Sequence, residues 1–238
     1  MIRRVAVVPH PPLLVDELVP GPNQAISALR AAVIDAVSWL RETDSHWVAV
    51  AVDAGPAAAF GPSVAGSFAG YGVDVVVSLS AGASGDEVSE PRELPLPVLI
   101  AGWLRGRAPA ETVRADVLGV ATSPDECAAF GRRLGESAED AGLLVLGDGS
   151  NRHGDRAPGG RDDRAPGFDS AVAAALADVD AEALAGLDPV LAAELGAVGR
   201  APWQVAAGVA AGGSWRGSLL YSDAPFGVGY HVALWESP

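Results

Sequence analysis

Residues 145–168 read VLGDGSNRHGDRAPGGRDDRAPGF, and the interpretation of the whole chain starts from this stretch. An apolar run at residues 143–146 predicts a buried strand that leads into it. The polar part that follows is rich in glycine and proline, a composition typical of loops. Unstructured loops longer than about 12–15 residues are uncommon in compact domains, and they are usually either functional or disordered. We therefore expect this loop to border a functional site.

The segments on either side of this loop predict alternating strands and helices. Residues 3–8 and 46–52 are continuous apolar runs, typical of strands that are covered on both faces. Asn23 is a plausible N-cap for a helix at residues 24–41, where apolar side chains recur at three- and four-residue spacing. Ser123-Pro-Asp-Glu126 has the pattern of a capping box and predicts a helix at residues 124–141. The remaining expected elements are strands at residues 73–79, 117–120, 217–221 and 229–235, a polar loop at 80–90, a helix at 96–105, and a helical region at 168–210 broken near Gly186, Asp188-Pro189 and Gly199.

This alternation predicts the fold class. Strands that alternate with helices are typical of an α/β protein, here a three-layer sandwich with helices on both faces of a central sheet. We expect the sheet to be largely parallel or mixed, with antiparallel strands near the C-terminus. A length of 238 residues suits one domain spanning residues 1–238.

Composition excludes several classes of protein. The net charge of −14 argues against partners such as nucleic acid or an anionic membrane surface. No apolar run is long enough to span a membrane, and the N-terminal run is too short for a signal peptide, so we expect a cytoplasmic protein. The single Cys127 excludes an intrachain disulfide and a thiolate zinc cluster.

Cofactor motifs are equally informative by their absence from the sequence. All 16 basic residues are arginines, which excludes Schiff-base chemistry and a P-loop lysine. No glycine-rich dinucleotide fingerprint follows the first strand. The sequence thus predicts no nucleotide-type cofactor, and the expected partner is a small-molecule substrate.

Polar groups follow the ends of three predicted strands. His10 follows the first, Asp53 follows the second, and the segment from Asp148 to His153 follows the strand at residues 143–146. In open α/β sheets, ligands bind outside the carboxyl ends of the strands. We therefore expect these side chains to share one rim of the sheet.

Three motifs resemble the class III extradiol ring-cleavage dioxygenases (the LigB-like proteins), and most of all an actinobacterial branch of that family. The first is a strand followed by Pro9-His10-Pro11-Pro12-Leu13-Leu14, and the second is Leu146-Gly-Asp-Gly-Ser-Asn-Arg-His153. The third is the tail at residues 221–235, YSDAPFGVGYHVALW. Their order and spacing agree with the family over nearly the whole chain.

The resemblance implies an oxidoreductase that cleaves a catechol-type diol. It implies non-haem Fe(II) held by two histidines and a carboxylate, or by three histidines in some branches, with open positions for the diol and O₂. By position His10 would be a metal ligand and His153 the acid/base. Asp148, which directly follows a buried strand between two glycines, would orient His153 or bind a metal. The family places its second histidine ligand where this sequence has Asp53-Ala54-Gly55, so Asp53 would have to substitute for it. The third ligand would be His231 or Glu236.

Other interpretations of the same residues stay open. If the missing histidine has abolished iron binding, the chain would be a non-catalytic binding or interaction protein. A third reading is a metal-dependent hydrolase built on Asp53, Asp148 and His153.

Individual side chains also have structural alternatives. Asp148 suits a simple turn and His231 a cross-strand position, while His46 is expected at the surface. Arg152, Arg156, Arg161 and Arg164 suggest an anion clamp, but the interleaved aspartates equally suggest a self-neutralising loop. The apolar strand ending in Trp235 suggests pairing across a homodimer.

Overall fold

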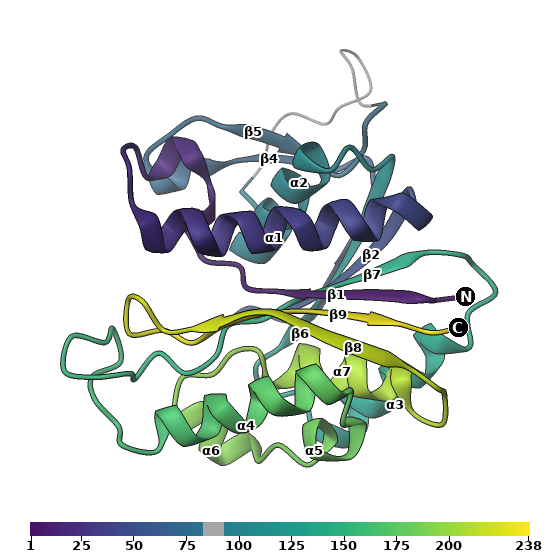
Figure 1. The fold of residues 1–238 in the computed structure, drawn as a ribbon. Coiled ribbons are helices and arrows are strands. Elements are labelled where there is room, and N and C mark those ends of the chain that lie inside the picture. The colour runs from purple at the N-terminus through teal and green to yellow at the C-terminus, as the bar shows by residue number, and fades with distance from the viewer. Residues whose placement is uncertain (83–92) are drawn as a thin grey trace.

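A seven-stranded sheet runs through the middle of the molecule (Figure 1). The structure is a computed structural model, and it describes residues 1–82 and 93–238. The strand order of the main sheet is β3-β6-β2-β7-β1-β9-β8, and β4 and β5 form a separate two-stranded sheet. The strands are β1 (Arg4–Val8), β2 (His46–Asp53), β3 (Ala58–Phe60), β4 (Ala65–Ser67), β5 (Val76–Ser78), β6 (Thr112–Gly119), β7 (Gly142–Leu146), β8 (Arg216–Asp223) and β9 (Tyr230–Glu236).

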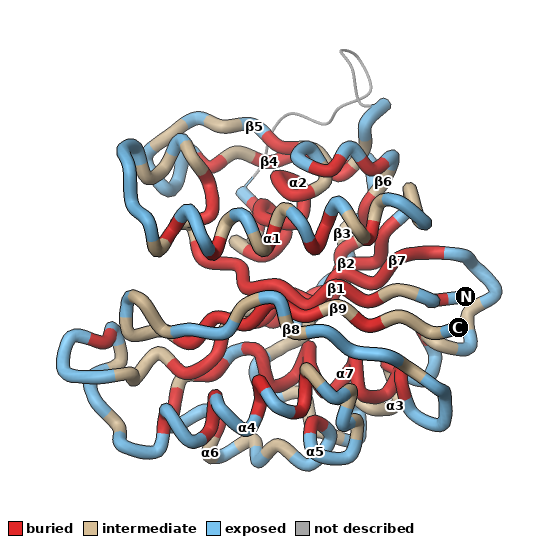
Figure 2. Tube along the Cα trace, viewed as in Figure 1, coloured by how far each residue is buried: buried red, intermediate tan, exposed pale blue. Residues whose placement is uncertain are grey.

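Helices cover both faces of this sheet. Helices α1 and α2 lie on one face together with the β4-β5 sheet, and α3 to α7 lie on the other (Figure 1). The helices are α1 (Gln24–Thr43), α2 (Leu96–Arg107), α3 (Pro124–Gly135), α4 (Ala165–Asp178), α5 (Ala181–Ala185), α6 (Pro189–Glu194) and α7 (Arg200–Ala210). Strands β1, β2, β7 and β9 are largely buried between the two layers, whereas the edge strand β8 is largely exposed (Figure 2). The predicted three-layer α/β sandwich is confirmed.

The direction of the strands determines where polar groups gather. Strands β1, β2, β6 and β7 run parallel to one another, so all four end at the same edge of the sheet, which we call the carboxyl edge. Strand β9 runs antiparallel to β1 and therefore begins at the carboxyl edge. Strand β8 runs antiparallel to β9 and ends there. Residues far apart in sequence are thus brought to one edge.

Both predicted helix caps are present. The Asn23 side chain accepts hydrogen bonds from the backbone N–H groups of Ala25 (3.1 Å) and Ile26 (3.2 Å), a type of cap that contributes about 1 kcal/mol. Ser123 Oγ accepts from the Glu126 N–H (3.3 Å), and Glu126 Oε2 accepts from the Ser123 N–H (2.9 Å). These local bonds fix the starts of α1 and α3.

Several predicted boundaries were wrong. Residues 73–79 supply only the short β5, which pairs with β4, because the longer β6 fills the place beside β2 with eight residue pairs in register. That strand runs from Thr112, well before the predicted start at Val117. Helix α3 ends at Gly135 and not at the predicted residue 141, because glycine is a poor helix former. The N–H of Glu136 makes the last hydrogen bond of the helix, to the Arg132 carbonyl.

The long loop after β7 is ordered by backbone hydrogen bonds. The N–H of Gly159 donates to the Asn151 carbonyl (2.9 Å), and the N–H of Asp162 donates to the Arg152 carbonyl (3.1 Å). The helix that follows begins at Ala165, three residues before the predicted start. The predicted polar loop at residues 80–90 lies outside the described residues from position 83 onward.

The C-terminal strand does not offer a free edge. Strand β9 is paired with β1 on one side and β8 on the other, so the predicted pairing of this strand across a dimer has no open edge to use. Trp235 is fully buried, and its Nε1 donates to the Leu176 carbonyl (2.7 Å). Across residues 1–82 and 93–238, no helix combines the length and the apolar character needed to cross a membrane.

Candidate functional site

His10 and Asp148 lie side by side at the carboxyl edge because they follow the neighbouring strands β1 and β7. The backbone N–H of His10 donates to Asp148 Oδ1 over 2.8 Å, and His10 Nδ1 lies 3.6 Å from the same oxygen. This Nδ1 atom is buried and has no hydrogen-bond partner among the described residues. The sequence prediction that the two residues share a rim is confirmed for this pair.

A second group is centred on the carboxylate of Asp169 in α4. His153 Nε2 is hydrogen-bonded to Asp169 Oδ2 at 2.5 Å, and His231 Nε2 is hydrogen-bonded to Oδ1 at 3.3 Å. The backbone N–H of Ser150 donates to both carboxylate oxygens, at 3.2 and 3.1 Å. Asp169 is only 4% exposed, and a buried carboxylate needs such donors to offset its lost hydration.

Two glycines make room for this carboxylate. A Cβ atom added to Gly149 or to Gly229 would collide with the Asp169 carboxyl group. The N–H of Gly149 donates to the Gly229 carbonyl (2.7 Å), which ties the loop after β7 to the start of β9. Only residues without a side chain allow α4 to place its carboxylate this close to both segments.

His231 is held on both sides of its ring. Its Nδ1 is hydrogen-bonded to Ser222 Oγ (3.0 Å), the residue that faces it across the β8-β9 pair. The Trp203 ring packs edge-on against it, with the ring centroids 5.9 Å apart. A continuous chain of hydrogen bonds therefore runs from the exposed Ser222 through His231 and Asp169 to His153.

This chain of hydrogen bonds borders open space. A hollow of about 210 Å³ is lined by all four of these hydrogen-bonded residues. A neighbouring hollow of about 590 Å³ is lined by His153, Arg156 and the loop at residues 224–227. Since His153 borders both hollows, a small molecule in either one can reach its ring.

The residues expected to hold a metal are not gathered as one set. Asp53 ends β2, and its Oδ2 accepts from the Gly55 N–H (3.1 Å). Both ring nitrogens of His231 are engaged, while His10 lies against Asp148. Within residues 1–82 and 93–238, no three His, Cys, Asp or Glu side chains are arranged to hold a metal ion.

Glu236, the alternative third ligand, lies away from the carboxyl edge. It ends the antiparallel strand β9, so it sits opposite the start of β1, where it accepts from Arg4 Nε (3.0 Å). His46 is exposed, as predicted, and its Nδ1 is hydrogen-bonded to Thr112 Oγ1 (2.8 Å).

The partner of His153 differs from the one that the sequence suggested. Asp169 makes the hydrogen bond that was expected from Asp148, which instead lies against His10. The negative charge of Asp148 acts on Tyr230 as well: burial, and secondly this charge, raise the pKa of the Tyr230 phenol. The acid/base candidate and the expected orienting residue therefore belong to two neighbouring groups.

Sequence reasoning missed Asp169, although a signal for it exists. Ala165, Asp169, Val172 and Leu176 repeat at helical spacing and form the buried face of α4. An aspartate on an otherwise apolar stripe is unusual, because charged side chains are rarely buried without a partner. A helix that begins at Phe168, as the sequence predicts, excludes Ala165 and places Asp169 in the first turn. The stripe of buried positions that includes Asp169 is then not apparent.

Two of the four arginines of the long loop, Arg161 and Arg164, are paired with acidic side chains. Arg161 pairs with Asp155 (3.3 Å) and Asp163 (2.8 Å), and Arg164 pairs with Asp162 and Glu194, both at 2.7 Å. The hydrogen bond from the Arg164 side chain lowers the pKa of Asp162 to about 2. These contacts favour the self-neutralising loop for Arg161 and Arg164. Arg152 and Arg156 make no ion pair among the described residues, so for these two the anion clamp stays a prediction.

Comparison with known proteins establishes the fold and no more. No protein-family model matches the sequence, and no curated protein matches it. Among solved structures, the chain is similar to the crystal structure of the uncharacterized protein JW3007 from Escherichia coli K12. The two share 12% sequence identity with a TM-score of 0.53, and the alignment covers 99% of this chain and 100% of that one. The chain therefore shares its fold with that protein over almost its whole length.

Proposed function

We propose that this protein is an enzyme in which His153 transfers a proton to or from a small-molecule substrate. The observation that carries the proposal is the 2.5 Å hydrogen bond between His153 Nε2 and Asp169 Oδ2 at the wall of an open hollow. Histidine titrates near neutral pH, which makes it the most common general acid or base in enzymes.

The contacts of the ring suggest which nitrogen meets the substrate. A neutral imidazole has one donor and one acceptor nitrogen. With Nε2–H donated to Asp169, the acceptor is Nδ1, which has no hydrogen-bond partner among the described residues. Asp169 would hold the ring in this tautomer and stabilise the imidazolium formed when Nδ1 takes a proton, as the aspartate does in serine-protease triads.

Replacing the histidine tests the proposal. Wild-type protein is screened, with and without added Fe(II), against catechol-type diols and against enolisable ketones whose carbon-bound protons exchange in D₂O. We expect His153→Gln to lower turnover by about 10²–10⁴-fold, the usual contribution of a general acid or base. His46→Gln, at an exposed histidine, is the matched control and should leave turnover unchanged. Full activity of His153→Gln would refute the proposal.

A second candidate is the ring-cleaving dioxygenase that the sequence motifs imply. The observation that favours it is the buried, unpartnered Nδ1 of His10 beside Asp148 Oδ1, since imidazole and carboxylate are the donors that non-haem Fe(II) takes. These two side chains supply one nitrogen and one oxygen donor. Asp53 and His231 do not complete the set among the described residues, so the expected triad of His10, Asp53 and His231 does not fit the ion.

Metal analysis tests this second candidate. The protein is purified anaerobically without chelator, and bound metals are quantified by mass spectrometry for the wild type, His10→Ala and the control His46→Ala. About one iron per chain that is lost only in His10→Ala would support the dioxygenase. Zinc or manganese lost in the same way would favour a metal-dependent hydrolase. Absence of metal after reconstitution with Fe(II), Zn²⁺ and Mn²⁺ in turn would exclude both.

A further inference from the structure

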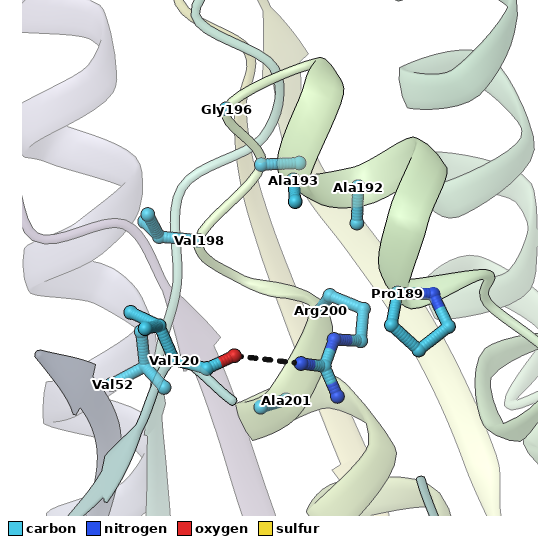
Figure 3. Close-up of a pocket in the computed structure, with 10 residues that line it drawn as sticks. Val52, Val120, Pro189, Ala192, Ala193, Gly196, Val198, Arg200 and Ala201 are labelled. Carbon is cyan, nitrogen blue, oxygen red and sulfur yellow. Dashed lines mark hydrogen bonds between the residues drawn. The ribbon is translucent and has the colours of Figure 1, made fainter. Parts of the chain in front are cut away.

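A separate cavity of about 250 Å³ opens at the carboxyl edge, beyond the ends of β2 and β6 (Figure 3). None of the residues of the His153 group lines it. Its walls are apolar, with Val52 and Val120 on the strand side and Ala192 and Val198 on the side of α6 and the segment that follows α6. Among the described residues, the one charged side chain in the lining is Arg200, in the first turn of α7.

Arg200 is a buried cation without an acidic partner. It is 5% exposed, yet no carboxylate lies within 4 Å of its guanidinium in the part of the chain that the structure describes. Its hydrogen bonds go to neutral acceptors: the carbonyls of Thr122 (2.7 Å) and Val120 (3.1 Å), and Gln204 Oε1 (3.0 Å). Buried arginines normally have a negative partner, because desolvating an unpaired charge is costly.

Two N–H groups of the Arg200 guanidinium have no acceptor among the described residues. Arginine carries five N–H groups, and the bonds to Thr122, Gln204 and Val120 use two on Nη1 and one on Nη2. The Nε–H and one Nη2–H are left without an acceptor among the described residues. Nε and Nη2 form one of the edges on which a guanidinium binds a carboxylate through two parallel hydrogen bonds.

We propose that this cavity binds a small apolar monocarboxylate, with its carboxylate on Arg200 and its hydrocarbon part against the valine and alanine side chains. The carboxylate of the ligand would be the acidic partner that Arg200 lacks among the described residues. The hydrocarbon part of the ligand would pack against the apolar walls. A volume of 250 Å³ is below the range of about 300–1,000 Å³ typical of sites for drug-sized molecules, so the ligand is of the size of benzoate or hexanoate. The position agrees with the rule that α/β sheets bind ligands beyond the carboxyl ends of their strands.

Calorimetric titration of the full chain tests the proposal with benzoate and hexanoate. We expect at least one of them to bind with one molecule per chain and a Kd of about 1 mM or lower, a realistic affinity for so few atoms. Benzamide, which matches benzoate in shape but lacks the charge, should bind about tenfold more weakly or not at all. Inorganic phosphate, which lacks the apolar part, should not bind.

Two variants locate the site. Arg200→Gln removes the charge, and Ala193→Phe fills the cavity from an exposed position in its lining while leaving Arg200 in place. Both should weaken carboxylate binding by about tenfold or more. Ala193→Phe keeps the test decisive if Arg200→Gln fails to fold.

Three results would overturn the proposal. One is that neither carboxylate binds to the wild type. Another is that benzamide or phosphate binds as tightly as benzoate. The third is that binding is unchanged in Ala193→Phe or in a folded Arg200→Gln.

Discussion

At the scale of single residues, the site depends on one carboxylate that serves several donors. Asp169 accepts hydrogen bonds from the Ser150 backbone and is bonded to the rings of His153 and His231. His153 is bonded to one oxygen of this carboxylate and His231 to the other, so the two histidines share a single acidic partner. A buried carboxylate is tolerable here because its hydration is replaced by these donors.

Replacing this carboxylate by an amide should destabilise the protein. In Asp169→Asn only one oxygen remains as an acceptor, so a buried imidazole or the Ser150 N–H loses its partner, at a cost of about 1–3 kcal/mol. Urea denaturation measures the difference in the free energy of unfolding. Asp178→Asn, at an exposed position of the same helix, should stay within about 0.5 kcal/mol of the wild type. Equal stability of Asp169→Asn and the wild type would contradict this account.

At the scale of elements, α3 and α7 approach each other along their glycines. A Cβ on Gly131 of α3 would lie 2.8 Å from the Gly208 Cα of α7, and a Cβ on Gly208 would lie 2.7 Å from the Ala128 carbonyl oxygen. Both obstacles are backbone atoms, which cannot rotate away as a side chain can. The two helices can therefore pack this closely only because neither has a side chain at the crossing.

Adding one methyl group at this crossing should force the helices apart. We expect Gly131→Ala to lower the free energy of unfolding by about 1–3 kcal/mol, as overpacking does in other cores. Gly106→Ala is the matched control, because that glycine lies exposed near the end of α2 with no atom within 4 Å of its added Cβ. It should instead stabilise the protein by about 0.5–1 kcal/mol.

The thiol of Cys127 gives a second readout of the same crossing. Cys127 lies in α3 and is buried, and burial raises the pKa of its thiol. Reaction with a thiol reagent should be slow in the wild type, because the reactive form is the thiolate. It should become faster in Gly131→Ala, and an unchanged rate there together with unchanged stability would show that the crossing tolerates a side chain.

At the scale of the whole molecule, the last strand completes the sheet. Strand β9 joins β1, the first strand, to β8, and its Trp235 fills the core between the sheet and α4. The first and last strands of the chain are held together by the direct pairing of β1 with β9. The C-terminal residues are therefore part of the core.

Truncating Trp235 should lower the free energy of unfolding more than a substitution at the surface does. Trp235→Ala is expected to destabilise the protein by about 3–5 kcal/mol, the range for large aromatic side chains in cores, as measured by guanidinium denaturation. Phe226→Ala removes an aromatic side chain that is 37% exposed in a loop, so its effect should be much smaller. Similar losses in the two variants would show that Trp235 does not fill the core as described.

Much of the fold was predictable because its signals are local. The apolar runs of β1, β2 and β7 and the caps at Asn23 and Ser123 each depend on a few consecutive residues. The short strands β3 and β4 carry no such signal, because three residues of Ala, Gly, Ser and Phe show no periodicity. They form strands only because a neighbouring strand offers its edge.

Local sequence patterns are enough to predict the three-layer α/β architecture and to place His10 and Asp148 together, since both follow strands that end at one edge. The carboxylate that binds His153 is instead set by the packing of the layers. Asp169 is 16 positions from His153 and 62 from His231, and these three meet because α4 packs its buried face against β8 and β9. Helical and strand periodicity are set by neighbours in the chain, whereas hydrogen bonds over such separations depend on how the layers pack. For that reason the fold could be read from the sequence, but the partner of the candidate catalytic histidine could not.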